Sequence, residues 1–342
     1  MKKLTINEIA EMVGVSKTTI SFYLNGKTNK MSDETQKKIQ QVIEETGYTP
    51  SAATRTVKAS DDCIGVILGD VSKPFAAKAL KGIEEEAHEA GYQVIVGNNE
   101  MSFAKEKEYV EHMLKMGVSG FIIQATYRFG ILAMELEKKN KKIIYLDIPP
   151  YDSQGVRVLG DNYQCVYDAI SQCIERGYDQ LLVVSDANES EYTGMDNLRG
   201  FKDAANDAGV SFKTYFIEAE TTREEIHDYL EQYISEYKKT LVYASDVEAL
   251  RKVYLGIKLF PDFQSLFPER LGLIGFDVTG WTKIAVPEIS AIMIPAYQEG
   301  QIASRKLIEM IESKNSISNK KVIIKNAVRW RDSTLYQEDI IE

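Results

Sequence analysis

Apolar positions at the start of the chain recur every three or four residues, the spacing of helices that bury one face. Three such stretches follow one another, at residues 6–13, 17–24 and 32–46, and Gly14 separates the first two. A helix, a tight glycine turn and a second helix, supported by a third, form a helix-turn-helix unit. The pattern therefore predicts a small helical domain at the beginning of the chain.

The predicted helix starts carry capping residues. Thr5 and Glu8 have the spacing of a capping box, in which the Thr5 hydroxyl accepts from the backbone N–H of Glu8 and the Glu8 side chain reaches back. Ser16 is placed to cap the second helix, and Ser32 precedes two acidic residues in the first turn of the third. Local chemistry and periodicity thus agree on where each helix begins.

From Cys63 onward the pattern changes to short continuous apolar runs that alternate with amphipathic helices, for example over residues 75–90. The runs are IGVIL, YQVIVGN, GFIIQA, KIIYLDI, QLLVVSD, TLVYASD and LGLIGFD. β-Branched runs of this kind are typical of parallel strands in βαβ units, covered by helices on both faces. We expect an α/β fold with two doubly wound parallel sheets and a boundary between them near Gly160.

Composition and charge narrow the class of protein. The 342 residues are 44% hydrophobic and 27% charged, as in an ordinary globular protein of two or three domains. No apolar run approaches the roughly 18 residues of a membrane helix, and the chain does not start like a signal peptide, so we expect a cytoplasmic protein. The net charge of -10 is uneven, because residues 1–60 hold 9 Lys and Arg against 6 Asp and Glu. A nucleic-acid-binding head on an acidic body has this asymmetry.

Cysteine and histidine indicate neither a disulfide framework nor a metal site. Cys63, Cys165 and Cys173 are widely spaced, and the three histidines are equally scattered. The motifs GxxxxGK[ST], GxGxxG after a strand, GxSxG and HExxH are absent. We therefore expect no metal, no cofactor and no enzymatic activity. A secreted sugar-binding protein is an alternative class, but such a protein would not need the helical head.

The head sequence TINEIAEMVGVSKTTISFYLNG, followed by MSDETQKKIQQVIEETGYTPSA, resembles the lactose-repressor/galactose-repressor (LacI/GalR) family of bacterial transcription regulators. The body adds IGVI, KPF, GIEEEAHEAGYQ, LGDN, GFD and IPAYQEGQIA, which are similar to the two-lobed sugar-binding core of that family, related to periplasmic binding proteins. Within the family, SKTTIS and MSDET look closest to regulators of sugar-acid use such as the ketodeoxygluconate repressors. The resemblance covers nearly the whole chain.

The resemblance implies three parts. These are a helix-turn-helix DNA-binding domain at residues 1–48, a hinge helix or linker at 49–60, and an effector-binding and dimerisation core at 61–342. Within the core we expect an N-lobe at about 61–160 plus 292–319 and a C-lobe at about 161–291 plus 320–342.

A helix that enters the major groove needs side chains that reach base edges and short polar groups that hold phosphates. The family implies base contacts from Lys17, Thr18 and Phe22. It implies phosphate contacts from Thr5, Ser16, Thr19, Ser21 and Asn25. The simpler alternative is that Ser16 only caps its helix and Thr19 only packs.

Phe22 departs from the family, in which many members carry arginine at this position. A phenyl ring cannot form the bidentate bond to guanine, which is worth about 1–3 kcal/mol of discrimination, but it can touch a thymine methyl group. We therefore expect the operator to differ from the usual family half-site at that base pair. The alternative is that Phe22 folds back onto the small helical core.

The linker TPSAATRTVKAS resembles the family's hinge helix, which folds on DNA and kinks a minor-groove step with an apolar residue. Ser51, Arg55 and Val57 fall on its contact positions. Two hinges that pack against each other require a homodimer on a near-palindromic operator. A plain flexible tether is the alternative.

Ligands of open α/β sheets bind beyond the carboxyl ends of the strands, and those ends are rich in acidic residues here. The resemblance places Phe75, Asp147, Ser245, Asp246 and Asp277 on effector-lining positions. Trp281 is a candidate stacking platform for a sugar ring. Asp246 also precedes a predicted helix, so a role as N-cap stays open.

Two departures affect the ligand class. The arginine that relatives place three residues before Gly-Phe is Asn197 here, although Arg199 is close, and Ser245 stands where asparagine is common. Lys73 also replaces a common asparagine and can meet a ligand carboxylate, unless it is simply solvated. We therefore expect a regulator of the repressor type that binds operator DNA and a sugar or sugar acid. The alternative effector is a nucleobase or a protein corepressor.

Overall fold

The computed structural model describes residues 4–24, 28–46, 63–147, 155–186, 194–234, 236–313 and 321–334. The expectations for Asn25 and for the hinge residues Ser51, Arg55 and Val57 lie outside the described residues. The chain divides into two compact units, Met1–Ser60 and Asp61–Glu342. They are called the head and the core below.

The head contains the three helices that the periodicity predicts. They are α1 (Ile6–Val13), α2 (Lys17–Leu24) and α3 (Asp33–Thr46), with a short 3-10 turn η1 (Thr28–Lys30) between the last two. The capping box of Thr5 and Glu8 is formed, and Gly14 ends α1 with φ +77°, a left-handed conformation that glycine adopts without strain. Ile9, Ile20 and Ile39 are fully buried where the three helices meet.

The core contains two six-stranded sheets, one in each lobe. The N-lobe sheet has the order β11 (Lys321–Ile324), β5 (Val156–Gly160), β4 (Lys142–Leu146), β3 (Gly120–Ile123), β1 (Cys63–Leu68) and β2 (Gln93–Asn98). The C-lobe sheet has the order β12 (Ala327–Arg329), β10 (Ser290–Met293), β9 (Leu271–Asp277), β8 (Thr240–Ala244), β6 (Gln180–Asp186) and β7 (Phe212–Ile217). All pairs are parallel except β10 with β12, so the expected parallel sheets need this one correction.

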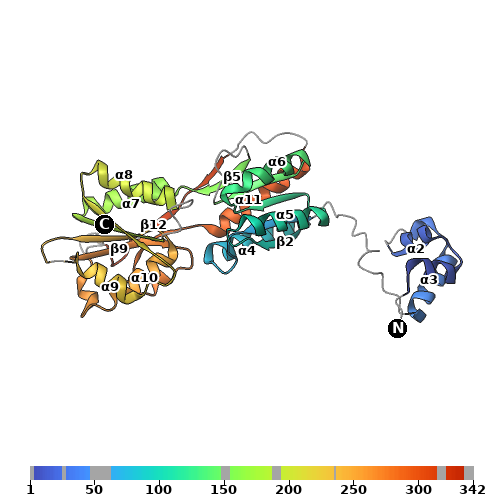
Figure 1. The fold of residues 1–342 in the computed structure, drawn as a ribbon, viewed down its shortest axis with the longest axis horizontal. Coiled ribbons are helices and arrows are strands. Elements are labelled where there is room, and N and C mark those ends of the chain that lie inside the picture. Colours follow the sequence, from blue (N-terminus) through green and yellow to red (C-terminus); the bar gives the residue numbers. More distant parts are fainter. Residues whose placement is uncertain are drawn as a thin grey trace. The chain divides into compact units, whose positions relative to one another are not determined.

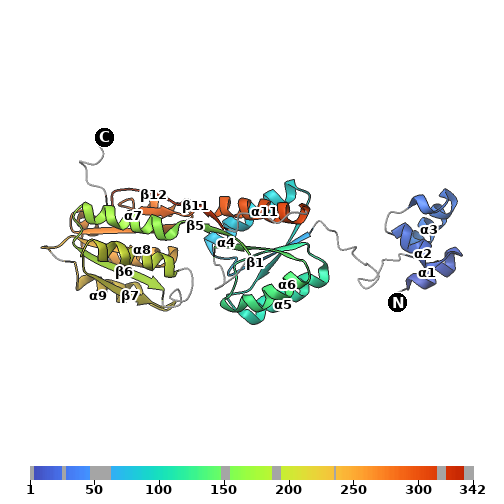
Figure 2. The same cartoon turned by 90° about the horizontal axis from the view of Figure 1, so that it is seen from above.

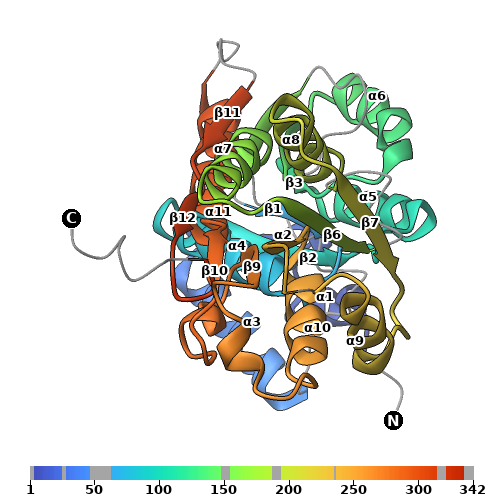
Figure 3. The ribbon, with the colours of Figure 1, turned by 90° about the vertical axis from the view of Figure 1, so that its left-hand side faces the viewer.

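Helices cover both faces of each sheet (Figures 1 and 3). In the N-lobe, α4 (Pro74–Glu89) and α11 (Ala296–Glu312) cover one face, and α5 (Phe103–Met116) and α6 (Gly130–Lys138) the other. In the C-lobe, α7 (Asn162–Glu175) and α8 (Gly194–Asp207) lie opposite α9 (Arg223–Glu231) and α10 (Val247–Ile257). Successive strand residues alternate between these layers, so that both faces of every central strand are buried.

Three chain segments connect the lobes, between β5 and α7, between β10 and α11, and between β11 and β12 (Figure 2). The boundaries therefore differ from those expected at the carboxyl end of the chain. Strand β11 completes the N-lobe sheet although residues 320–342 were expected in the C-lobe. Strand β10 belongs wholly to the C-lobe sheet, although the expected boundary of about residue 292 divides it. Pairing between strands far apart in sequence decides this boundary.

Two glycines allow α4 and α11 to approach each other closely. A Cβ atom on Gly82 would overlap the carbonyl oxygen of Tyr297, and one on Gly300 would overlap the carbonyl oxygen of Ala79.

Among the helices of the described ranges, none is long and apolar enough to cross a membrane.

Candidate functional site

Helix α2 presents polar side chains on the surface of the head. Ser16, Lys17 and Thr18 are exposed at its N-terminal end, and Thr19 and Ser21 are half-buried. Ile20 is the one fully buried residue of the helix, and Tyr23 and Leu24 also pack against the core of the head. The sequence-based expectation of a polar helix surface is thus matched by the geometry, and DNA contact by these residues stays a prediction.

Ser16 caps α2, as its position in the sequence predicts. Its Oγ accepts from the backbone N–H of Thr19 at 3.1 Å and lies 2.9 Å from the Thr19 hydroxyl. Both hydroxyls remain at the exposed end of the helix, where the positive end of the helix dipole favours a phosphate. Capping therefore does not compete with the expected phosphate contact.

Phe22 does not fold back onto the core of the head. The cluster around Ile9, Ile20 and Ile39 includes Tyr23 and Leu24 but not Phe22. The Phe22 ring is half-buried, and the Nζ of Lys30 lies 5.0 Å from the ring centroid. A cation above the ring stabilises its position outside the core cluster, and base contact by Phe22 stays a prediction.

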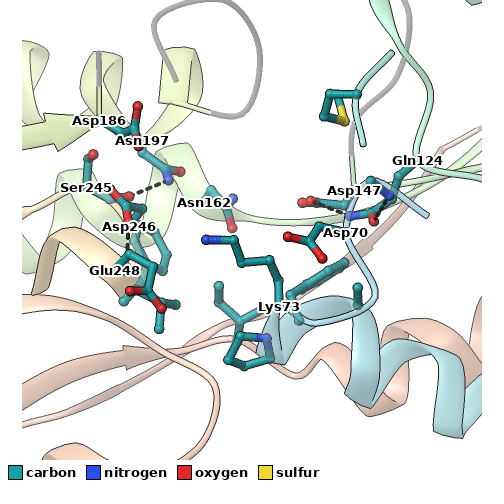
Figure 4. Close-up of a pocket in the computed structure, with 18 of the residues that line it drawn as sticks. Asp70, Lys73, Gln124, Asp147, Asn162, Asp186, Asn197, Ser245, Asp246 and Glu248 are labelled. Atoms are coloured by element: carbon teal, nitrogen blue, oxygen red, sulfur yellow. Dashed lines mark hydrogen bonds between the residues drawn. The ribbon is translucent and has the colours of Figure 1, made fainter. Parts of the chain in front are cut away.

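The core contains a cleft of about 720 Å³ whose lining comes from both lobes. Its polar residues follow the carboxyl ends of strands: Asp70 after β1, Gln124 after β3 and Asp147 after β4, facing Asp186 and Asp246 of the C-lobe (Figure 4). Ligands of open α/β sheets bind at this edge. Six of the nine expected effector residues line the cleft: Lys73, Phe75, Asp147, Asn197, Ser245 and Asp246.

On the N-lobe wall, Gln124 links two loops. Its Oε1 accepts from the backbone N–H of Gly69 at 3.0 Å, and its Nε2 donates to Asp147 Oδ2 at 3.3 Å. Burial raises the pKa of Asp147 to about 6, and the hydrogen bond from Gln124 only partly offsets this effect. The cleft therefore holds a carboxyl group that titrates near neutral pH.

On the C-lobe wall, two acceptors have no hydrogen-bond partner within the described part of the chain. Asp246 caps α10 through Oδ1, which accepts from the N–H groups of Glu248 and Ala249, both at 2.8 Å, while its Oδ2 is unpaired. Asn197 donates from Nδ2 to the Ser245 carbonyl at 2.9 Å, while its Oδ1 is unpaired. Burial raises the pKa of Asp246. Both oxygens are suited to accept from hydroxyl groups of a ligand.

Asp277 has a structural role instead of the expected contact with the effector. It is fully buried and does not line the cleft. Its carboxylate accepts from the backbone N–H groups of Thr279, Gly280 and Thr282 and from the Thr282 hydroxyl. Burial acts to raise the pKa of Asp277, but these hydrogen bonds outweigh it and hold the pKa below its usual value. The side chain organises the loop after β9.

Trp281 and Arg199 also lie away from the cleft, which corrects two further expectations. Trp281 packs on the C-lobe core beside Tyr254, with ring centroids 5.6 Å apart. Arg199 is exposed on α8, where its Nη2 lies 3.2 Å from Asp196 Oδ1 and its guanidinium stacks on Tyr163.

Several cleft residues were missed by the sequence analysis. They are Gln124, Met101, Phe103, Thr126, Tyr127, Arg128, Asn162, Asp186, Glu248, Phe276 and Ile294, with the backbone around Gly69 and Pro74. Gln124 and Asp186 had an available signal, because each ends a predicted strand on the ligand-binding edge. Phe103 and Arg128 had none, since only the packing of α5 on the loop after β3 brings them together. Within the described ranges, no group of three or more His, Cys, Asp or Glu is placed to hold a metal.

Both the head and the core match models of known protein families. Residues 5–51 match the family model of bacterial regulatory proteins of the lacI family, and residues 61–331 match the periplasmic binding proteins and sugar binding domain of the LacI family. Catabolite control protein A from Priestia megaterium is 27% identical over 334 residues, which cover 97% of this chain and 99% of that protein. The transcriptional regulator KdgR of Bacillus subtilis is 26% identical, over 90% of this chain and 91% of its own length.

Solved structures agree in fold. A LacI-family transcriptional regulator from Silicibacter pomeroyi superposes with a TM-score of 0.75 at 17% identity, over 97% of this chain and 99% of that chain. The matched relatives are transcription regulators and not enzymes. With a helix-turn-helix head, a two-lobed cleft at the strand ends and both family models matched, this chain belongs to the LacI family of DNA-binding transcription regulators.

Proposed function

We propose that this LacI-family regulator is a repressor whose homodimer binds a near-palindromic operator and whose DNA affinity is set by a carbohydrate or sugar acid bound in the cleft. The observation that carries the proposal is the position of the cleft, which is lined by both lobes. A ligand that contacts both lobes favours one arrangement of them. It therefore changes the DNA affinity by its difference in affinity for the two arrangements, typically about 1–3 kcal/mol.

The chemistry of the lining supports a carbohydrate class of ligand. Carboxylate and amide oxygens of Asp70, Asn197 and Asp246 suit sugar hydroxyls, while the rings of Phe75 and Phe276 offer apolar surface to C–H groups. The family description of this part of the chain is also a sugar-binding domain. The alternative effector, a nucleobase or a protein corepressor, is an outcome of the experiment below.

Exposed apolar residues on the C-lobe support the homodimer. Ile284 is 82% exposed, Val286 57% and Leu255 39%. The Tyr254 hydroxyl bonds the backbone of Val286, so α10 and the loop after η5 (Trp281–Lys283) meet in one surface region. Apolar side chains in one exposed region indicate a protein contact. A second copy would also bring two heads to the two half-sites of an operator.

A regulator of chromosomal DNA acts in the bacterial cytoplasm.

A thermal-shift screen of the full-length protein tests the effector class. Neutral sugars, sugar acids, sugar phosphates and purines are compared, since a ligand at 100 times its dissociation constant stabilises the folded protein by about 2.7 kcal/mol. Compounds that shift the melting temperature are then added to a complex of the protein with operator DNA. Stabilisation by sugars or sugar acids that also changes DNA affinity supports the proposal, and stabilisation by purines alone contradicts it.

A further inference from the structure

Two cations on the N-lobe wall of the cleft stand out because the other charged groups there are acids. Lys73 precedes α4, and Arg128 belongs to the short 3-10 turn η2 (Tyr127–Phe129). Neither side chain forms a salt bridge within the described ranges. The cleft carboxylates belong to Asp70, Asp147, Asp186, Asp246 and Glu248. Hydrogen bonds from Ser72, and then the charge of Lys73, lower the pKa of Asp70. Neither cation is held in an ion pair in the described part of the chain, so both are available to a ligand.

Arg128 is held in place by the structure beneath it. Its guanidinium carbon lies 4.7 Å from the centroid of the Phe103 ring, which also lines the cleft. The turn that carries Arg128 begins at Thr126, whose backbone N–H donates to the buried carboxylate of Glu106 at 2.8 Å. Asn99 Nδ2 donates to the same carboxylate. This buried network fixes the loop and, with the stacking on Phe103, reduces the entropy lost when Arg128 binds a ligand.

Lys73 lies at the N-terminus of α4, a helix of 16 residues that has Pro74 at its start and no side-chain cap. Lys73, Pro74, Phe75 and Ala76 all line the cleft, so the first turn of the helix borders it. The helix dipole adds positive potential to that of the lysine. Figure 4 shows the Lys73 side chain extended into the middle of the cleft, toward Asn162.

The described C-lobe residues that line the cleft include no cation. Asn197 lines the cleft and is 6% exposed. Among the described residues, neither Asn197 Oδ1 nor Asp246 Oδ2 has a hydrogen-bond partner. Unpaired buried acceptors call for donors from a ligand. One wall is therefore suited to an anion and the other to hydroxyl groups.

We propose that the cleft binds a hydroxylated anion in one orientation, with its carboxylate or phosphate on Lys73 and Arg128 of the N-lobe and its hydroxyl groups donating to Asn197 Oδ1 and Asp246 Oδ2 of the C-lobe. The inference rests on the proposed function and adds the charge and orientation of the ligand. It assigns the anion contact to Arg128, a residue that the sequence did not single out, and not to the region of Asn197 and Arg199.

The test uses calorimetric titration of the full-length protein with aldonates, uronates, sugar phosphates and the neutral parent sugars. At least one anion is expected to bind about tenfold or more tightly than its neutral parent. Arg128→Gln and Lys73→Gln are each expected to lower the affinity for that anion about tenfold while changing the affinity for the neutral sugar little. Arg199→Gln, which removes an exposed arginine outside the cleft, is the matched control and leaves both affinities unchanged.

The sources of the anion are separated by the panel, since binding of carboxylates alone identifies a sugar acid and binding of phosphates alone a sugar phosphate. Equal affinity for anion and neutral parent, or equal losses for both in Arg128→Gln, overturns the inference. A neutral sugar that binds tightly and alters operator affinity overturns it as well, but leaves the regulator function intact. Circular dichroism of each variant confirms that the losses do not come from unfolding.

Discussion

At the residue scale, Phe22 of the head stands where the family resemblance implies arginine in many members. The ring is half-buried at the surface, outside the apolar cluster, with Lys30 above it. Since a phenyl ring offers no hydrogen bond, its contribution to base selection is restricted to apolar contact, for example with a thymine methyl group. We therefore expect this single residue to influence specificity at one operator position.

Replacing Phe22 with arginine is expected to create a preference for guanine at that operator position, worth about 1–3 kcal/mol, because arginine can bond O6 and N7 together. A base-by-base substitution scan of the operator, read by DNA affinity, measures this preference. Phe22→Leu is the control that keeps an apolar contact and gains no such preference. Strong guanine selection by the unmodified protein at the same position would contradict the assignment.

Glu299 is a second residue with a distinct prediction. It lies in the first turn of α11, is 1% exposed, and neither carboxyl oxygen has a hydrogen-bond partner in the described structure. Burial, and then the nearby Asp147 and Asp161, raise the pKa of Glu299 to about 8 from 4.5. The unfolded chain releases this proton as the pH rises past 4.5 while the folded chain retains it, so the residue's contribution to stability declines between these values.

Glu299→Gln keeps the shape of the side chain and removes its titration. The variant is expected to be more stable than the parent at pH 8 by roughly 1–3 kcal/mol, and similar to it at pH 5. Denaturant unfolding of the two proteins across this range measures the difference. A stability difference that does not change with pH would show that Glu299 does not titrate as assigned.

At the element scale, the contact between α4 and α11 depends on glycine. Gly82→Ala or Gly300→Ala places a methyl group against a backbone carbonyl of the facing helix, and the helices must separate. We expect each change to cost about 1–3 kcal/mol or more in the free energy of unfolding, because a rigid backbone cannot yield as a side chain can. Gly130→Ala, at the start of α6 with open space around it, is the matched control and should be neutral.

Strands that contain a continuous apolar run were predictable, and these include β2 at the edge of the N-lobe sheet. The runs that became β1, β4, β6 and β9 are apolar over most of their length because helices cover both faces, and this composition is visible in the sequence. The sequence analysis missed the edge strands β7, β11 and β12 and the inner strands β5 and β10, which are short or mix polar and apolar residues, so that pairing with a neighbour defines them.

At the scale of the whole molecule, DNA binding and ligand binding belong to separate compact units. A fragment of residues 61–342 is expected to keep its affinity for the effector and to lose operator binding. Gel-shift assays and calorimetry on the fragment and the full chain measure the two properties. Retention of sequence-selective DNA binding by the fragment would contradict the division of function.

Operator affinity of the full-length protein should fall steeply with salt, because each phosphate contact of the head releases counterions on binding. A plot of the logarithm of the affinity against that of the salt concentration gives the number of such contacts. Lys17→Gln should reduce the slope by about one if Lys17 contacts a phosphate and leave it unchanged if it contacts only bases. A slope near zero for the unmodified protein would exclude the proposed docking.

Sequence alone determined the parts of this protein whose cause is local. Helix periodicity, capping residues and Gly14 specify the head, and continuous apolar runs specify the central strands, because each depends on residues near one another in the chain. Only the tertiary structure decided which side chains share the cleft. Asp277 bonds to its own loop, Trp281 packs on the C-lobe core, and Arg128 stacks on Phe103 of α5. The direction of each side chain depends on neighbours that are distant in the sequence, and the linear pattern does not contain them.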